Sequence, residues 1–149
     1  MILETKKLDE VCDVVRGGSP RPIKKYITTS SDGLNWIKIS DATASNKYIF
    51  KTKQKIKKEG ALRSRIVKKG DLILSNSMSF GRPYIMMTDG CIHDGWLVLS
   101  NYQSKLNIEY FYYLLSSPYI IQQFEKSATG STVRNLNIAL VKNIKISFP

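Results

Sequence analysis

Short strand-like segments separated by turns run through the middle of the chain, and they restrict the possible folds more than any other feature. Alternating or continuous apolar residues predict strands over 35–39, 49–56, 71–75, 84–87 and 95–100. Glycine-containing turns at 30–33, 81–83 and 89–90 separate several of these segments. Such a series of short strands predicts that a sheet forms the first part of the fold.

A helical pattern follows the strands and differs from them in period. Apolar residues recur at spacings of three and four from Ile108 to Phe124. Asn107 is a suitable N-cap, and Pro118 predicts a kink or a break between two helices. Residues 141–148 alternate weakly as a last strand, and residues 7–15 are a short helix or strand that leads into the domain. The predicted class is α+β, a twisted, mostly antiparallel or mixed sheet with a C-terminal helical pair.

The composition indicates one folded domain without a membrane-spanning segment. The chain has 149 residues, of which 42% are hydrophobic, so it carries enough apolar surface for a core. Its apolar runs are too short to cross a bilayer, and the N-terminus lacks a secretory signal, so we expect a cytoplasmic protein. Cys12, Cys91 and the single His93 cannot complete a four-ligand zinc site. Reduced thiols are favoured over a disulfide between Cys12 and Cys91.

The charge is strongly positive and unevenly distributed. The net charge is +11, and segment 51–69 alone holds nine bases against Glu59, or +8. Such a surplus attracts a phosphate-bearing partner, either nucleic acid or an anionic membrane surface. Lys51, Lys53, Lys55 and Lys57 recur every second residue, so a strand over 49–56 would place them on one face. The alternative is an edge strand whose lysines deter aggregation.

Phosphate binding is favoured over the edge-strand alternative, because Arg63, Arg65, Lys68 and Lys69 follow the lysine row, and double-stranded DNA is the leading hypothesis for the partner. The expected phosphate contacts are Lys51, Lys53, Lys55, Arg63 and Arg65. Segments 75–82 and 129–135 each combine hydroxyls, an amide and an arginine, which suit base edges or the backbone. The candidates there are Ser77, Ser79, Arg82, Ser131, Thr132 and Arg134. The alternatives are an ordinary polar turn for the first segment and a linker for the second.

The sequence signatures of several catalytic classes are absent. Residues 17–19 lack the lysine of a nucleotide-binding loop, and no Pro-Pro occurs, as an adenine methyltransferase motif would require. The acids are isolated rather than clustered as in a two-metal nuclease. His93 beside Asp94 suggests a turn histidine with local hydrogen bonds, and a small hydrolase is the disfavoured alternative. Trp36 and Trp96 are expected in the core rather than stacked on bases. We therefore expect no catalytic residue, metal or cofactor.

Several motifs occur in an order that resembles a known family. They are Gly17-Gly18-Ser19-Pro20, Trp36-Ile37-Lys38-Ile39-Ser40-Asp41, Lys69-Gly70-Asp71-Leu72-Ile73-Leu74-Ser75, Ser79-Phe80-Gly81-Arg82-Pro83, His93-Asp94-Gly95-Trp96-Leu97, Tyr112-Tyr113-Leu114-Leu115 and Gly130-Ser131-Thr132 with Leu136. Together they resemble a target recognition domain of the specificity subunit of type I restriction-modification enzymes. The resemblance covers nearly the whole chain.

The resemblance implies a function in DNA reading without catalysis. Such a domain reads one half of a bipartite DNA target for methyltransferase subunits, which transfer a methyl group from S-adenosylmethionine to adenine N6. It also serves motor-nuclease subunits, so ATP and Mg are used by the partners. The chain stops at Pro149, where a spacer helix is expected, so 1–149 is interpreted as a single recognition domain from a half-length or truncated subunit, a recombination cassette or an excised piece. The alternative is a protein–protein module that binds methyltransferase subunits as an assembly fragment or decoy.

Overall fold

The computed structural model describes residues 2–76, 81–128 and 138–149. The strands are β1 (Glu4–Lys7), β2 (Asp13–Arg16), β3 (Ile27–Thr28), β4 (Leu34–Ile37), β5 (Tyr48–Ile49), β6 (Gln54–Ile56), β7 (Arg65–Val67), β8 (Leu72–Ser75), β9 (Pro83–Met86), β10 (Gly90–Ile92), β11 (Trp96–Ser100) and β12 (Lys145–Phe148). The helices are α1 (Ile39–Ser45), α2 (Lys58–Ala61), α3 (Ile108–Leu115), α4 (Pro118–Ala128) and α5 (Ile138–Lys142). Short 3₁₀ turns occupy Leu8–Glu10 and Ile23–Lys25.

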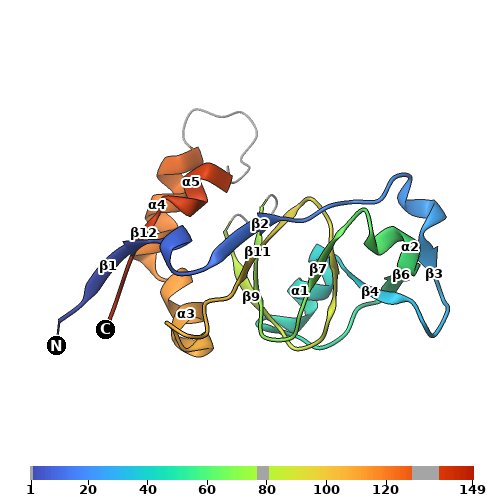
Figure 1. Cartoon of the computed structure of the whole chain (residues 1–149), viewed down its shortest axis with the longest axis horizontal. Helices are drawn as coiled ribbons and strands as arrows, with labels where there is room; N and C mark the ends of the chain where they lie inside the picture. Colours follow the sequence, from blue (N-terminus) through green and yellow to red (C-terminus); the bar gives the residue numbers. More distant parts are fainter. Residues whose placement is uncertain (1, 77–80, 129–137) are drawn as a thin grey trace.

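The strands form two five-stranded sheets and one two-stranded ribbon. The first sheet has the order β2-β11-β8-β9-β5, the second has the order β3-β6-β4-β10-β7, and the ribbon pairs β1 with β12. The β4–β10 and β5–β9 pairs are parallel, and the other pairs are antiparallel. The molecule is elongated, with both termini and helices α3, α4 and α5 toward one end and β3, β6 and α2 at the other (Figure 1). The predicted α+β class with a mixed sheet and a C-terminal helical pair is confirmed.

The first sheet is covered on both faces, which explains why its strands are almost continuously apolar. In β8, Leu72 and Leu74 belong to the core cluster beneath the helices, which includes Phe111 and Phe124. Ile73, between them, belongs to a second cluster that the two sheets share. Because successive side chains of a strand point to opposite faces, Leu72, Ile73 and Leu74 of β8 are all apolar.

The predicted tryptophan core and helical pair are both confirmed. Trp96 is fully buried and Trp36 nearly so. The Asn107 side chain caps α3 by accepting hydrogen bonds from the amides of Glu109 (2.9 Å) and Tyr110 (3.2 Å). Pro118 begins α4, because proline needs no backbone donor at the first helical position. Cys12 and Cys91 are free and buried.

The prediction of one strand over 49–56 is wrong. Strand β5 ends at Ile49 and pairs with β9, whereas β6 begins at Gln54 and pairs with β3 and β4 in the other sheet. Ile49 and Ile56 are both buried but belong to different clusters. Seven positions separate them, so a single continuous strand would have pointed them to opposite faces. The chain instead crosses between sheets, and the row of four lysines on one strand does not form.

Three other predicted boundaries differ from the structure. The strand predicted over 35–39 ends at Ile37, because Ile39 begins α1, whose Asp41 side chain accepts the amide of Lys38 (2.9 Å). Residues 7–15 contain a 3₁₀ turn followed by β2, and the strand in 141–148 starts only at Lys145, after α5. Strands β1, β3, β7 and β10 and helices α1, α2 and α5 were not predicted. Among the described helices, none is long and apolar enough to cross a membrane.

Candidate nucleic-acid interface

The basic segment 51–69 extends along the half of the molecule away from the termini. It runs from the end of β5 through β6 and α2 at the far end and returns along β7 (Figure 1). Lys51, Lys53, Arg63 and Arg65 are exposed, and Lys55 is partly exposed. Cations from one stretch of sequence therefore lie at several places on this half of the molecule.

Lys51 and Lys53 lie beside a hollow of about 470 Å³ next to α1. Phe50, which also lines it, is 64% exposed. The amide of Lys53 donates to Oδ1 of Asp41 (3.1 Å), which holds this segment against α1. The two lysine side chains therefore project from an anchored backbone, together with an exposed aromatic ring.

Lys55 lies in β6, between the two neighbouring strands of the second sheet. It pairs with Thr28 of β3 and Asn35 of β4, so the three residues form one polar row across the sheet. Asn35 donates to Thr88 Oγ1 (3.2 Å) and to the Asp89 carbonyl (3.0 Å).

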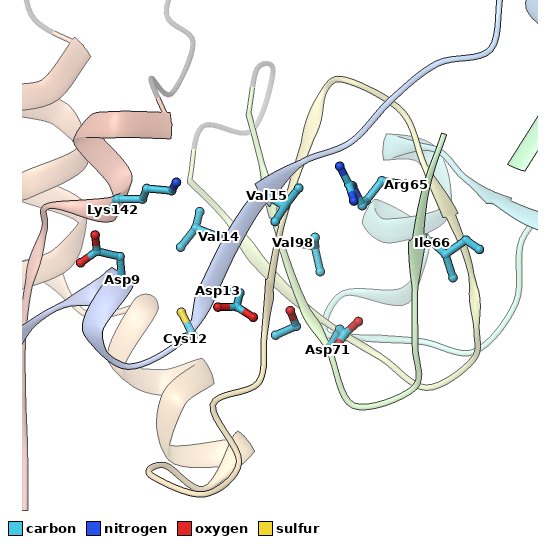
Figure 2. A pocket seen from close by; sticks show the side chains of 11 residues that line it. Asp9, Cys12, Asp13, Val14, Val15, Arg65, Ile66, Asp71, Val98 and Lys142 are labelled. Atoms are coloured by element: carbon cyan, nitrogen blue, oxygen red, sulfur yellow. The ribbon is translucent and has the colours of Figure 1, made fainter. Parts of the chain in front are cut away.

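Arg65 lies apart from these lysines. Strands β4 and β10 separate its strand, β7, from β6. Arg65 lines a hollow of about 500 Å³ together with Asp9, Asp13 and Asp71 (Figure 2). Burial is the main cause that raises the pKa of Asp71 above its ordinary value. Arg65 and these three acids therefore line one hollow, and the structure does not group Arg65 with the lysines.

A polar cluster forms where segment 17–21 crosses the turn between β10 and β11. Gly17 donates its amide to the Trp96 carbonyl (2.9 Å), and Gly18 donates to the Ile92 carbonyl (3.0 Å). The Ser19 hydroxyl donates to Oδ1 of Asp94 (3.1 Å), and Nη2 of Arg21 lies 3.3 Å from Oδ2 of the same carboxylate. Side chains far apart in the sequence thus meet on one turn.

Two further segments join this cluster. Arg63 lies next to segment 17–21, because a Cβ at Gly18 would lie 3.2 Å from its carbonyl oxygen. The Asn76 amide group donates to the Asp94 carbonyl (3.3 Å) from the end of β8. Arg63 therefore lies beside this cluster.

His93 supports the turn through local contacts, as predicted. Its Nδ1 accepts the amide of Gly95 (3.0 Å), and its ring lies 5.7 Å from that of Trp36 and 6.0 Å from that of Trp96. Burial lowers the pKa of His93, so the neutral imidazole that accepts this bond is favoured. Within the described ranges, no group of three or more His, Cys, Asp or Glu side chains could hold a metal ion.

Arg82 lies at the other end of the β8–β9 connection. Its Nη2 donates to Oδ1 (2.8 Å) and to the carbonyl (3.3 Å) of Asn46, and its guanidinium lies 5.3 Å from the centre of the Tyr84 ring. Arg82 is exposed but held against the end of α1. The remaining predicted contacts, Ser77, Ser79, Ser131, Thr132 and Arg134, lie outside the described residues.

Sequence reasoning missed Ser19, Arg21 and Asp94 as members of a common surface. Two features of the sequence pointed to these residues separately, a glycine pair before Ser19 and the turn at His93–Gly95. Ser19 and Asp94 are 75 positions apart, so nothing local indicated that they meet.

Comparison with known proteins identifies the family of the chain. The family model for the type I restriction modification DNA specificity domain matches residues 3–149. Three solved structures share the fold at low sequence identity, and each match covers 99% of this chain. A chain from a study of complex assembly and conformational transition of the type I R-M system is 20% identical, with a TM-score of 0.76 over 34% of its own length. The HsdS subunit from Thermoanaerobacter tengcongensis is 20% identical, with a TM-score of 0.73 over 33% of its length.

The third structure is the type I restriction-modification S subunit from M. genitalium. It is 17% identical, with a TM-score of 0.62 over 34% of its length. This chain therefore spans about a third of the length of each of these proteins. With the family model matched from residue 3 to residue 149, the chain belongs to the family of type I restriction-modification DNA specificity domains.

Proposed function

We propose that this chain reads one half of a bipartite DNA target for a type I restriction-modification complex. The observation that carries the proposal is the exposed basic segment 51–69, at +8, on a DNA specificity domain whose net charge is +11. A polyanion is drawn to such a surface by phosphate neutralisation and counterion release. The chain supplies specificity, and partner subunits carry out N6-adenine methylation and DNA cleavage.

The proposed contacts fall into two classes. Lys51, Lys53, Lys55 and Arg63 bind phosphates along the far half of the molecule, and Arg65 contributes less because the hollow that it lines also holds Asp9, Asp13 and Asp71. Polar groups near base edges or the backbone complete the set, and these are Arg82, Ser77, Ser79, Ser131, Thr132 and Arg134. Phosphate contacts position the domain on the duplex, and base contacts select the sequence.

The proposed partners are double-stranded DNA, methyltransferase subunits and motor-nuclease subunits. Residues 1–149 act as one target recognition domain, with S-adenosylmethionine, ATP and Mg used by the partners. The proposed location is the cytoplasm, where the buried free thiols of Cys12 and Cys91 remain reduced.

A salt titration of DNA binding tests this function. Fluorescence anisotropy with a labelled duplex of mixed sequence, between about 50 and 200 mM salt, should show affinity falling by about 10³-fold if the surface makes some six phosphate contacts. The triple variant Lys51→Ala/Lys53→Ala/Lys55→Ala should reduce the slope of log affinity against log salt by about one for each phosphate-binding lysine removed. A triple variant of three other exposed lysines, Lys7→Ala/Lys126→Ala/Lys145→Ala, controls for net charge.

Two results would contradict the proposal. Absent or salt-insensitive binding would remove the electrostatic basis of DNA recognition. Complex formation with methyltransferase subunits by a chain that binds no DNA, unaffected by the lysine variants, would favour an assembly fragment or decoy instead.

A further inference from the structure

We infer that Arg21 is a base-reading arginine for guanine and that Asp94 holds its guanidinium in position. The inference rests on the proposed DNA-binding function and adds a specificity residue to it. It depends on the contacts of the turn between β10 and β11, on an adjoining apolar hollow and on the exposure of Arg21.

The Asp94 carboxylate is fixed before it meets Arg21. Its Oδ1 accepts the Ser19 hydroxyl (3.1 Å), and the Asp94 amide donates back to the Ser19 Oγ (3.3 Å). The amides of Gly17 and Gly18 bind carbonyls on either side of the same turn. Ser19 and Asp94 therefore hold each other on a hydrogen-bonded platform rather than on a free loop.

Arg21 is held by this carboxylate and still reaches solvent. Nη2 of Arg21 lies 3.3 Å from Oδ2 of Asp94, and the two side chains are 77% and 54% exposed. Among the described residues, the contact uses one terminal nitrogen of the guanidinium. The other donors stay available for a bidentate contact with O6 and N7 of guanine, and a restrained arginine loses less entropy on making that contact.

The surroundings of Arg21 suit a base rather than a phosphate alone. Beside it lies a hollow of about 680 Å³ whose walls include Pro20, Pro22 and Trp36. These apolar walls match the sugar and methyl surfaces of the nucleotides that flank the guanine. Lys24, exposed at the same hollow, supplies a cation for the neighbouring phosphate.

Arg82 differs from Arg21 in how its donors are used. Nη2 of Arg82 contacts two oxygens of Asn46, and its guanidinium lies over the Tyr84 ring. Arg21 instead extends from a platform with one carboxylate contact. Of these two arginines, Arg21 is the better placed to read a base.

The test compares sequence preference with overall affinity in the full chain. Duplexes selected from a randomised pool by the wild-type chain are sequenced, and Kd values are measured for the preferred duplex and for one with its guanine replaced. The variants are Arg21→Ala, Arg21→Lys and Asp94→Ala, with Lys24→Ala as the matched control. Thermal melts confirm that each variant is folded.

Arg21→Ala should lose roughly 5- to 150-fold of discrimination at one guanine position, because both donors to the base are removed. Arg21→Lys should lose part of it, because lysine lacks the planar pair of donors that arginine presents. Asp94→Ala should weaken the same preference while binding to the replaced duplex is unchanged or tighter, since a carboxylate has been removed. Lys24→Ala should weaken both duplexes equally.

The inference is overturned if Arg21→Ala keeps the wild-type preference or if the wild-type chain binds DNA with no preference for guanine. In either case salt-sensitive binding would leave the proposed function standing. Absence of any DNA binding by the wild-type chain would overturn both.

Discussion

Gly17 lies directly against the backbone of His93: a Cβ atom at position 17 would be 2.0 Å from the His93 carbonyl oxygen. No residue with a side chain fits there without moving one of the two segments. The contact sets the path of 17–21 across the turn between β10 and β11. Ser19 and Arg21 therefore reach Asp94 only because position 17 has no side chain.

Gly17→Ala should therefore destabilise the fold and disturb the turn. The expected loss in the free energy of unfolding is about 1–3 kcal/mol, because the added methyl group meets rigid backbone. Urea denaturation measures the loss. Gly18→Ala is the matched control and should cost less, since its Cβ would lie 3.2 Å from the nearest atom, the Arg63 carbonyl oxygen. Equal stability of Gly17→Ala and the wild type would contradict the close contact.

Lys53→Ala and Arg65→Ala remove the same charge from different surroundings. Lys53 projects from the segment held by Asp41, whereas Arg65 faces the hollow that contains Asp9, Asp13 and Asp71. We expect Lys53→Ala to reduce the salt slope of DNA binding by about one, and Arg65→Ala to leave the slope nearly unchanged. Anisotropy titrations at several salt concentrations make the comparison. Matching losses would mean that the DNA surface extends across β7.

His93 should make the stability of the protein fall as the pH falls. Burial lowers its pKa in the folded state below the ordinary value of 6.5. Below about pH 6.5 the unfolded chain therefore binds a proton more readily than the folded chain, so acid favours unfolding until the folded pKa is passed. Above about pH 7.5 both states are neutral at this residue and the effect vanishes.

His93→Asn separates this titration from the hydrogen bond, because the asparagine oxygen can still accept the amide of Gly95. The free energy of unfolding, measured by denaturant titration between about pH 5 and 8, should fall less steeply with falling pH in the variant. The two slopes should differ by up to about 1.4 kcal/mol per pH unit. Parallel profiles for the two proteins would show that His93 does not titrate differently on folding.

Phe124 should be a large contributor to the docking of α4 on the first sheet. Its side chain is almost fully buried, and a Cβ at Gly81 would lie 2.7 Å from its Cδ2 atom. Phe124→Ala should lower the free energy of unfolding by about 3–5 kcal/mol, because apolar surface is no longer buried and a cavity remains. Gln122→Ala, an exposed change on the same helix, should stay within about 0.5 kcal/mol. A small effect of Phe124→Ala would mean that α4 is not docked as described.

Local sequence signals were sufficient for the elements whose ends and faces are decided within a few residues. The Asn107 cap and Pro118 predicted where α3 begins and where α4 starts, because caps act over one helical turn. The apolar run within 71–75 predicted a buried strand, since a strand without a polar face must be covered on both sides, and 95–100 was predicted as a strand. The charge of segment 51–69 was likewise visible in the sequence alone.

Long-range pairing decided the rest, and only the tertiary structure shows it. The alternating lysines of 51–57 imitate a strand, yet the burial of Ile49 and Ile56 in different clusters divides the segment between two sheets. Arg21 and Asp94 are 73 positions apart and meet because two glycines allow backbone to pack on backbone. The sequence determined the class of fold, the charge and the helical pair. The packing of distant segments decided which cations share a surface. The energy of that packing is a property of the whole chain rather than of any local pattern.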